Sequence, residues 1–337
     1  FDTNYGKIAN MTLRQMSSGN NLACISINSG RFIIEECDIS CQSDAAIVIK
    51  KDADPRLRNN IITDCIGIGV LVANGGQGLL EENQLLRNST AISIKNNSRP
   101  ILQRNTISQN RSYGIAISGD CQGLLEENII SNNAREGIVI SYGSNPILRK
   151  NKVHDHLSDG IRISDNASGN LEENEIFRNK NGIYIIDSDP ILRKNIIHDS
   201  KEQGLDIVDS SRVIIIEDND IFNNDKGIRI YREGNAVIRH NKIYRNKYWG
   251  VYLGSNVKCI LENNDIFEND SAGVHISDNA NPVLRHNRIN KNVRGVSISD
   301  GGYGTYEYND LRNNKYGAWN VSVDTKSKIK SFLNQEA

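Results

Sequence analysis

Residues 146 to 185, PILRKNKVHDHLSDGIRISDNASGNLEENEIFRNKNGIYI, contain one motif twice. The first copy pairs LRKNKV with GIRI, and 23 residues later the second copy pairs LEENEI with GIYI. Each copy therefore has two short apolar segments separated by polar turn residues. The branched side chains stand two residues apart, as in Ile161 and Ile163, which is the period of a strand with one buried face. The motif predicts short strands.

The motif recurs along nearly the whole chain, in steps of 21 to 24 residues. An asparagine or, once, a cysteine marks the same position in each copy: Cys37, Asn60, Asn83, Asn105, Asn128, Asn151, Asn174, Asn195, Asn219, Asn241, Asn264, Asn287 and Asn309. Such regular self-similarity indicates a solenoid. Isoleucine and valine dominate both apolar segments, which argues against leucine-rich repeats. We predict an all-β fold, a right-handed single-stranded parallel β-helix of about 13 coils with a period of 22–23 residues.

We expect three regions along this solenoid. Residues 1–30 should form the first coil and an N-terminal cap, residues 31–320 the parallel β-helix repeats, and residues 321–337 a C-terminal cap or tail. In the last region Ile329, Phe332 and Leu333 stand at helical spacing, which predicts a short helical cap. An open solenoid end exposes apolar side chains and unpaired strand edges, and a cap would cover them.

Two rows of side chains are expected to stabilise the stacking of coils. Asparagines at equivalent positions can hydrogen-bond to one another along the stacking direction and can satisfy turn backbone. Two residues before each asparagine, acidic and basic residues alternate almost without fault, from Glu35 and Arg58 to Arg285 and Glu307. Parallel stacking in register would place opposite charges on neighbouring coils.

The composition of the chain limits which partners and which cellular compartment are expected. With 40 Lys+Arg against 41 Asp+Glu, the chain has no electrostatic footprint for nucleic acid. No run of about 18 apolar residues and no signal-peptide pattern is present, so we expect no membrane insertion and no leader in these residues, which we take to belong to a larger protein.

Six cysteines without metal-ligand spacing predict scattered reduced thiols and no bound metal, and they favour the cytoplasm over secretion. A pairing of Cys41 with Cys65, which fall at neighbouring turn positions of adjacent repeats, is the disulfide alternative.

The segments GQGLLEEN (76–83), PILRKNKVHD (146–155) and LEENEIFRN (171–179) resemble the parallel β-helix repeats of the β-helix F-box proteins. The resemblance extends over residues 31 to 315. It implies a β-helix of the carbohydrate-binding and sugar-hydrolase type, which those proteins use to recognise a protein substrate for ubiquitylation. No F-box is present in these residues, so a ligase role does not carry over. The same repeat type occurs in polysaccharide lyases, mannuronan epimerases and copper-transport periplasmic proteins, so it is specific for fold and weak for function.

A carbohydrate-active enzyme, meaning a polysaccharide lyase, epimerase or hydrolase, is one of two hypotheses. A lyase would need a base near the uronate carboxyl and an acidic cluster for Ca²⁺, and a hydrolase would need paired carboxylates. The catalytic candidates are His154, Asp155, His198, Asp206 and Arg229. The epimerase signature Asp-Pro-His-Asp is absent, because Asp54-Pro55 continues into Arg and Asp189-Pro190 into Ile. Other coils carry different residues at the positions of these His-Asp pairs, which favours a structural role in a turn over catalysis.

The leading hypothesis is a non-catalytic recognition or scaffold module that binds a protein or polysaccharide on a lateral sheet face, without a cofactor. It is based on the outward residue of the second apolar segment, which reads Val48, Leu71, Ser93, Ala116, Val139, Arg162, Tyr184, Asp206, Arg229, Tyr252, His275, Ser297 and Trp319. The first half of this row is apolar, and the second half carries residues suited to recognition. The expected binding residues are Arg162, Tyr184, Arg229, Tyr252 and His275, with Trp249 at the edge. The competing interpretation is an ordinary solvated sheet in which Asp206 and Arg229 form a cross-coil ion pair.

Overall fold

The computed structural model describes residues 1, 4–17, 22–209, 213–323 and 329–336. Contacts divide the chain into two units, residues 1–175 and 176–337. Every regular element in the described residues is a β-strand, and the described strands pair in parallel. The prediction of an all-β parallel solenoid is confirmed. The two units together make about 14 turns, against about 13 expected.

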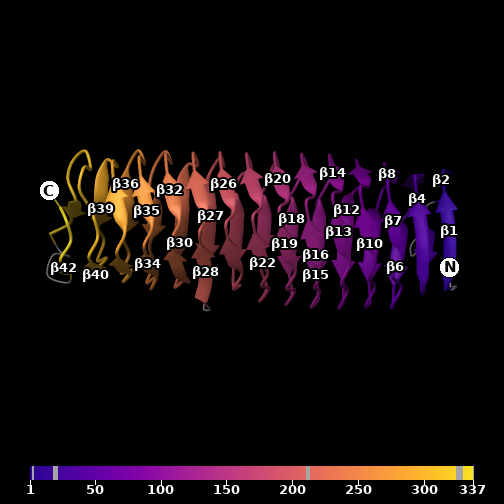
Figure 1. Cartoon of the computed structure of the whole chain (residues 1–337), viewed down its shortest axis with the longest axis horizontal. Coiled ribbons are helices and arrows are strands. Elements are labelled where there is room, and N and C mark those ends of the chain that lie inside the picture. Colours follow the sequence, from indigo (N-terminus) through magenta and orange to yellow (C-terminus); the bar gives the residue numbers. More distant parts are fainter. Residues whose placement is uncertain (2–3, 18–21, 210–212, 324–328, 337) are drawn as a thin grey trace. The chain divides into compact units, whose positions relative to one another are not determined.

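The first unit consists of three parallel sheets, here called A, B and C, and each turn of the chain adds one strand to each (Figure 1). Sheet A contains β1 (Tyr5–Ala9), β4 (Arg31–Glu35), β7 (Arg56–Arg58), β10 (Leu79–Glu81), β13 (Ile101–Gln103), β16 (Leu124–Glu126), β19 (Ile147–Arg149) and β22 (Asn170–Glu172). Sheet B contains β2 (Thr12–Gln15), β5 (Asp38–Cys41), β8 (Ile61–Thr63), β11 (Gln84–Leu86), β14 (Thr106–Ser108), β17 (Ile129–Ser131) and β20 (Lys152–His154). Sheet C contains β3 (Ala23–Ile27), β6 (Ala45–Lys50), β9 (Ile68–Ala73), β12 (Thr90–Lys95), β15 (Ile115–Ser118), β18 (Ile138–Ser141) and β21 (Ile161–Ile163).

The second unit repeats this arrangement, and β23 (Glu175–Phe177) contains the boundary between the units. Its sheet A contains β25 (Ile191–Arg193), β28 (Val213–Glu217), β31 (Asn235–Arg239), β34 (Ile260–Glu262), β37 (Val283–Arg285), β40 (Gly304–Glu307) and β42 (Ile329–Phe332). Sheet B contains β26 (Ile196–His198), β29 (Asp220–Phe222), β32 (Lys242–Tyr244), β35 (Asp265–Phe267) and β38 (Arg288–Asn290). Sheet C contains β24 (Ile183–Ile186), β27 (Gln203–Val208), β30 (Lys226–Tyr231), β33 (Val251–Leu253), β36 (Ala272–Ile276), β39 (Arg294–Ile298) and β41 (Trp319–Val321).

Each turn has three strands, because the first apolar segment of the repeat is in fact two strands. In LRKNKV the chain bends at Lys150, whose φ is 55°, between β19 and β20. A second bend at Asp155, with φ 59°, separates sheet B from the path to sheet C. The left-handed conformation costs a non-glycine residue roughly 1–2 kcal/mol, so each bend needs compensation from its surroundings. The residue after each bend supplies it.

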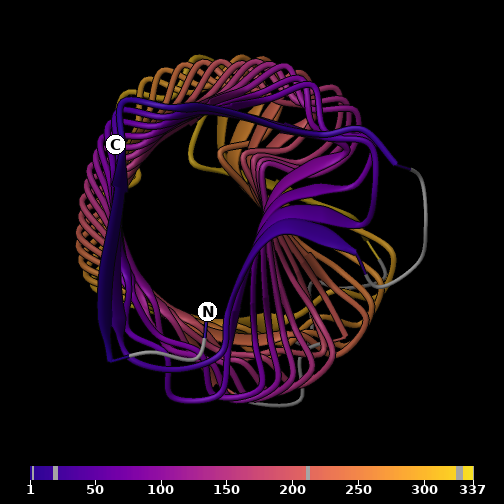
Figure 2. The same cartoon turned by 90° about the vertical axis from the view of Figure 1, so that its right-hand side faces the viewer.

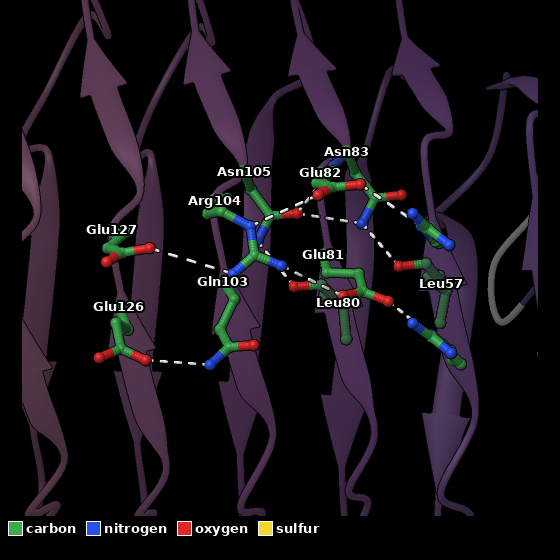
Figure 3. A network of polar contacts seen from close by, with 12 residues as sticks. Leu57, Leu80, Glu81, Glu82, Asn83, Gln103, Arg104, Asn105, Glu126 and Glu127 are labelled. Carbon is green, nitrogen blue, oxygen red and sulfur yellow. Dashed lines mark hydrogen bonds and ion pairs between the residues drawn. The ribbon is translucent and has the colours of Figure 1, made fainter.

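The predicted asparagine ladder is confirmed, and from Asn60 onward it follows the first bend of the turns. Figure 3 shows part of it: the Asn83 side-chain amide donates to Asn105 Oδ1 at 3.0 Å and to the carbonyl of Leu57 at 2.9 Å. The backbone N–H of Asn83 also donates to Asn105 Oδ1, at 3.1 Å. The same pattern recurs in the second unit, for example from Asn241 to Asn264. These side chains are almost completely buried, so the amides satisfy backbone groups that water cannot reach.

A second ladder, which the sequence analysis missed, occupies the second bend. In the first unit its members are Cys65, Asn88, Asn110, Asn133 and His156, and in the second unit Asn179, Ser200, Asn224, Asn246, Asn269, Asn292 and Asn314. His156 takes the place of an amide: the N–H of Asn133 donates to its Nδ1 at 3.1 Å, and its Nε2 lies 3.1 Å from the carbonyl of Ile130. Glycine begins many sheet C segments beside this ladder, because a Cβ at Gly114 would lie 2.6 Å from the Gly137 carbonyl oxygen.

The alternating acids and bases stand in register as predicted. Arg58 pairs with Glu35 and Glu81 on the neighbouring strands, and Glu217 pairs with Arg193 and Arg239. Glu217 accepts a hydrogen bond from Arg193 at 3.1 Å and forms an ion pair with Arg239 at 2.9 Å. In the first unit the partners are less regular, since Arg104 reaches both Glu81 and Glu82 at 3.4 Å (Figure 3). Most of these pairs are half-exposed and are worth at most about 1 kcal/mol each, so their main role is to define the register.

The expected helical cap is wrong for the described part of residues 321–337. Ile329–Phe332 is strand β42, which pairs in parallel with β40, and Leu333 has the left-handed φ of 50°. Asn334 then continues the ladder, accepting from the backbone N–H and the side chain of Asn309, both at 2.9 Å. The helical spacing of these three residues is coincidental, because Ile329 and Phe332 belong to a strand and Leu333 forms the bend that follows it. Residues 324–328 and 337 lie outside the described residues.

All six cysteines are free, as the spacing predicted, and Cys41 and Cys65 are not paired. Burial raises the pKa of the Cys65 and Cys259 thiols to about 12, which keeps both protonated and unreactive near neutral pH. In the part of the chain that the structure describes, no helix is long and apolar enough to cross a membrane.

Candidate functional site

Sheet C of the second unit brings five of the expected residues into one row. Tyr184, Asp206, Arg229, Tyr252 and His275 lie on the successive strands β24, β27, β30, β33 and β36, and each is the register partner of the next. Arg162 belongs to the first unit, on β21, where its guanidinium lies 4.0 Å from Asp159. It is therefore not part of the site described below.

The expectation that this row faces solvent is wrong at several positions. Asp206 is 1% exposed and Ser297 8%, and in the first unit Val48 is 7% exposed. In the first unit, the sheet C strands lie inside the outline traced by the turns on either side of them (indigo and purple arrows in Figure 2). A recessed sheet face shields its outward side chains, and the row is accordingly half-buried. Trp319 was also misplaced: it aligns with Val296, and Asn320 takes the outward position.

Asp206 and Arg229 form the expected cross-coil ion pair. Arg229 donates from Nε to Asp206 Oδ1 at 2.8 Å and from Nη2 to Oδ2 at 2.6 Å. The hydrogen bond to Asp206 raises the pKa of Arg229. This bidentate geometry occupies both carboxylate oxygens, so Asp206 orients Arg229 and is poorly placed to act as a nucleophile or proton donor. The guanidinium also lies 4.8 Å from the centroid of the Tyr231 ring.

Trp249 stacks on two members of the row. Its ring centroid lies 5.1 Å from that of Tyr252 and 4.7 Å from that of His275, with an angle of only 8° to the imidazole plane. The Tyr252 hydroxyl donates to Asp278 at 3.2 Å and accepts from Ser277 at 3.0 Å. Burial lowers the pKa of His275 and raises that of Tyr252, so both rings are neutral at pH 7. Offset stacking fixes the orientation of all three rings.

A shallow pocket of about 270 Å³ lies beside this stack. Its lining residues come from β30 and from the next turn of the chain: Lys226, Arg229, Tyr231, Trp249, Tyr252 and Ser255. Lys226 Nζ lies 3.0 Å from Asp225 and 5.4 Å from the Tyr248 ring centroid. The expected binding residues did not include Lys226 or Tyr231, because neither stands in the outward row. Lys226 and Tyr231 are the first and last residues of β30, and the sequence alone did not indicate where this strand begins and ends.

The catalytic candidates His154 and Asp155 belong to the second bend of one turn in the first unit. Asp155 is the left-handed residue of that bend, a conformation that aspartate tolerates better than most residues. Its Oδ2 lies 2.6 Å from His154 Nδ1. The neighbouring His156 is the ladder member described above, and burial lowers its pKa to about 4. The same His-Asp geometry recurs at His198 and Asp199, where Asp199 is again the left-handed residue.

His198 is also part of an aromatic stack on sheet B of the second unit, which the sequence analysis did not predict. Phe177, His198, Phe222, Tyr244 and Phe267 stack with centroid separations of 4.8 to 5.0 Å and interplanar angles of 1 to 14°. The sequence signal was present, since aromatic residues recur two residues before the second-ladder position. Both faces of the imidazole are covered by phenylalanines, which indicates a structural role for His198.

We expect that His198→Phe keeps the free energy of unfolding within about 1 kcal/mol of the native value, because it replaces one stacked ring by another. His198→Ala should cost about 1–2 kcal/mol through the loss of two ring contacts. Urea denaturation of the two variants measures both values. A catalytic role for His198 would give a different pattern, in which His198→Phe removes an activity on uronate polysaccharide that the native protein shows.

Among the described residues, no group of three or more His, Cys, Asp or Glu side chains is arranged to hold a metal ion.

Comparison with known families supports the fold. The right-handed β-helix region family matches residues 1–122, 90–234 and 207–332. The chain belongs to this family of right-handed β-helix proteins. Among curated proteins, none matches the sequence.

Solved structures with the same fold are distant in sequence. The periplasmic alginate epimerase AlgG is 15% identical with a TM-score of 0.60, over 86% of this chain and 77% of that chain. The Vag8–C1 inhibitor complex contains a chain that is 12% identical with a TM-score of 0.63, over 98% and 95% of the two chains. The Dettilon tailspike protein is 12% identical with a TM-score of 0.52, over 87% and 62%. At these identities the similarity shows the fold alone.

Proposed function

We propose that this chain is a recognition module that binds an extended ligand along the outer face of sheet C in its second unit. The observation that carries the proposal is the pocket formed by Trp249, Tyr252, Tyr231, Arg229 and Lys226. Large rings with fixed orientation offer contact area at low entropy cost, and the two cations supply hydrogen-bond donors. Successive strands are about 4.8 Å apart, so partly exposed members of the row such as Tyr184, Arg229 and Tyr252 offer contacts to a polymer at multiples of that spacing.

Two further observations favour recognition over catalysis. Asp206, a candidate catalytic acid, is buried and has both oxygens bound by Arg229, and His198 is stacked between two phenylalanines. The resemblance of the LEEN and PILRKN coils to the β-helix F-box proteins supports the same proposal, and so does the occurrence of this fold in a complex with C1 inhibitor. A carbohydrate-active enzyme is the alternative, suggested by the shared fold of the alginate epimerase AlgG.

Replacing both Trp249 and Tyr252 by alanine should weaken ligand binding at least tenfold, about 1.4 kcal/mol, because these rings line the pocket. A panel of polysaccharides and polypeptides, followed by tryptophan fluorescence and calorimetry, identifies the ligand used. Tyr142→Ala, which removes an exposed tyrosine of the first unit, is the matched control and should bind like the native protein. Equal loss in both variants would contradict the proposal. Release of unsaturated products from a uronate polysaccharide would establish the enzyme alternative.

A further inference from the structure

Each of the two cations that line the pocket on sheet C, Arg229 and Lys226, is paired with a carboxylate outside the lining. Arg229 is held by Asp206 through two hydrogen bonds, and Lys226 lies 3.0 Å from Asp225. Two positive and two negative charges thus sum to zero at the pocket. Arg232, whose guanidinium lies 5.6 Å from the centroid of the Tyr231 ring, is also paired, with Asp209 at 3.7 Å. An acidic polymer would have to compete with these internal carboxylates for each cation.

The next turn makes the site less favourable still for an anion. Asp278 accepts from the Tyr252 hydroxyl, so a carboxylate stands at the far end of one pocket wall. His275, beneath Trp249, adds no compensating charge because burial lowers its pKa. The pocket therefore lacks the net positive potential that concentrates acidic polysaccharides or acidic peptides.

The remaining features of the pocket are flat rings and hydrogen-bond donors. Trp249, Tyr252 and Tyr231 present ring surface, while Ser255, Lys226 and Arg229 carry polar hydrogens. None of the six lining residues is aliphatic. A pocket that binds an apolar side chain of a protein partner is usually lined mainly by hydrophobic groups, so this lining fits such a partner poorly. A pyranose ring suits these walls, because its axial C–H groups form an apolar face of aromatic size while its hydroxyls point outward to donors and acceptors.

From this combination we infer that the ligand of the sheet C face is a neutral polysaccharide, whose hexose rings stack on Trp249 and Tyr252 and hydrogen-bond to Arg229, Lys226 and Ser255. The inference rests on the proposed function of the same face and specifies its ligand class. Asp206 and Asp225 act as the selectivity residues, since they neutralise the cations that would otherwise attract uronates. The sheet would bind successive sugar units of one chain, because neighbouring turns continue the row on both sides of the pocket.

Calorimetry with four kinds of probe tests this: neutral hexose oligosaccharides of several linkages, oligo-uronates, polyglutamate and polylysine. We expect a neutral oligosaccharide to bind with less than a twofold change in affinity between roughly 50 and 500 mM salt, since no net charge is involved. Trp249→Ala should weaken that binding at least tenfold, and Tyr142→Ala should not. Asp225→Asn, which frees Lys226 at a half-exposed position, should raise the affinity for oligo-uronates several-fold at low salt.

The outcomes separate the inference from the proposed function. If oligo-uronates or a polypeptide bind the native protein more tightly than every neutral oligosaccharide, and Trp249→Ala removes that binding, the ligand class is wrong and the binding face is right. If Asp225→Asn leaves uronate affinity unchanged, Asp225 does not govern selectivity and the inference fails at that point. If no probe shows binding that depends on Trp249, both the inference and the proposed face are refuted.

Discussion

Replacing Asn105 by leucine is expected to lower the free energy of unfolding by about 3–5 kcal/mol, a large share of the stability of a typical domain. The Asn105 side chain accepts from the backbone N–H of Asn83 at 3.1 Å and from its amide at 3.0 Å. It also donates to the Leu80 carbonyl at 2.8 Å (Figure 3). A further hydrogen bond runs from its amide to Asn128 Oδ1 at 2.9 Å. Leucine has nearly the same size but would leave these buried groups without partners, at about 1–3 kcal/mol for each unsatisfied group.

Urea denaturation of Asn105→Leu and of a matched control measures the effect. Asn145→Leu is the control, because Asn145 is exposed and precedes Pro146 outside the strands. The control should change the free energy by no more than about 0.5 kcal/mol. Two variants with the same small effect would mean that the ladder amides contribute little beyond filling space, and the account of the bends given above would be wrong.

The asparagine ladder is also where sequence reasoning succeeded most fully. Asparagine occupies the position of Asn105 in nearly every repeat of the solenoid. This regularity indicated both the parallel register and a hydrogen-bonded role for the side chain. The second ladder escaped notice because Cys65, His156 and Ser200 interrupt its asparagines. The bends themselves were unpredictable from propensity, since Glu82 or Lys150 is not a residue type that favours positive φ.

The candidate site was predicted in part for a similar reason. Arg229, Tyr252 and His275 share one row because strand periodicity specifies which residues point outward, and the Asp206–Arg229 pair follows from parallel stacking. Periodicity alone does not report how deeply a sheet is recessed or where strand ends converge. Lys226 was missed for that reason, whereas Tyr231, two residues after Arg229 on β30, lies where strand alternation places it on the same face. Arg162 belongs to the other unit.

His156 offers the second large effect, a loss of stability on acidification. Burial lowers the pKa of His156 from an ordinary value of 6.5 to about 4, so the folded protein keeps it neutral while the unfolded chain takes up a proton below pH 6.5. Because the folded pKa is the lower one, the stabilisation is fully present above pH 6.5 and is lost as the pH falls toward 4. The expected loss from this group is about 3 kcal/mol across that range.

The variant His156→Asn isolates this contribution, because it places the usual ladder residue at the same position. At pH 7 we expect its stability to equal or exceed that of the native protein, since an amide can accept from Asn133 and donate to the Ile130 carbonyl, as the other ladder asparagines do. Between pH 7 and pH 4 its free energy of unfolding should fall by about 3 kcal/mol less than that of the native protein. Parallel pH profiles for the two proteins would refute a buried neutral His156, and with it the assignment of this histidine to the second ladder.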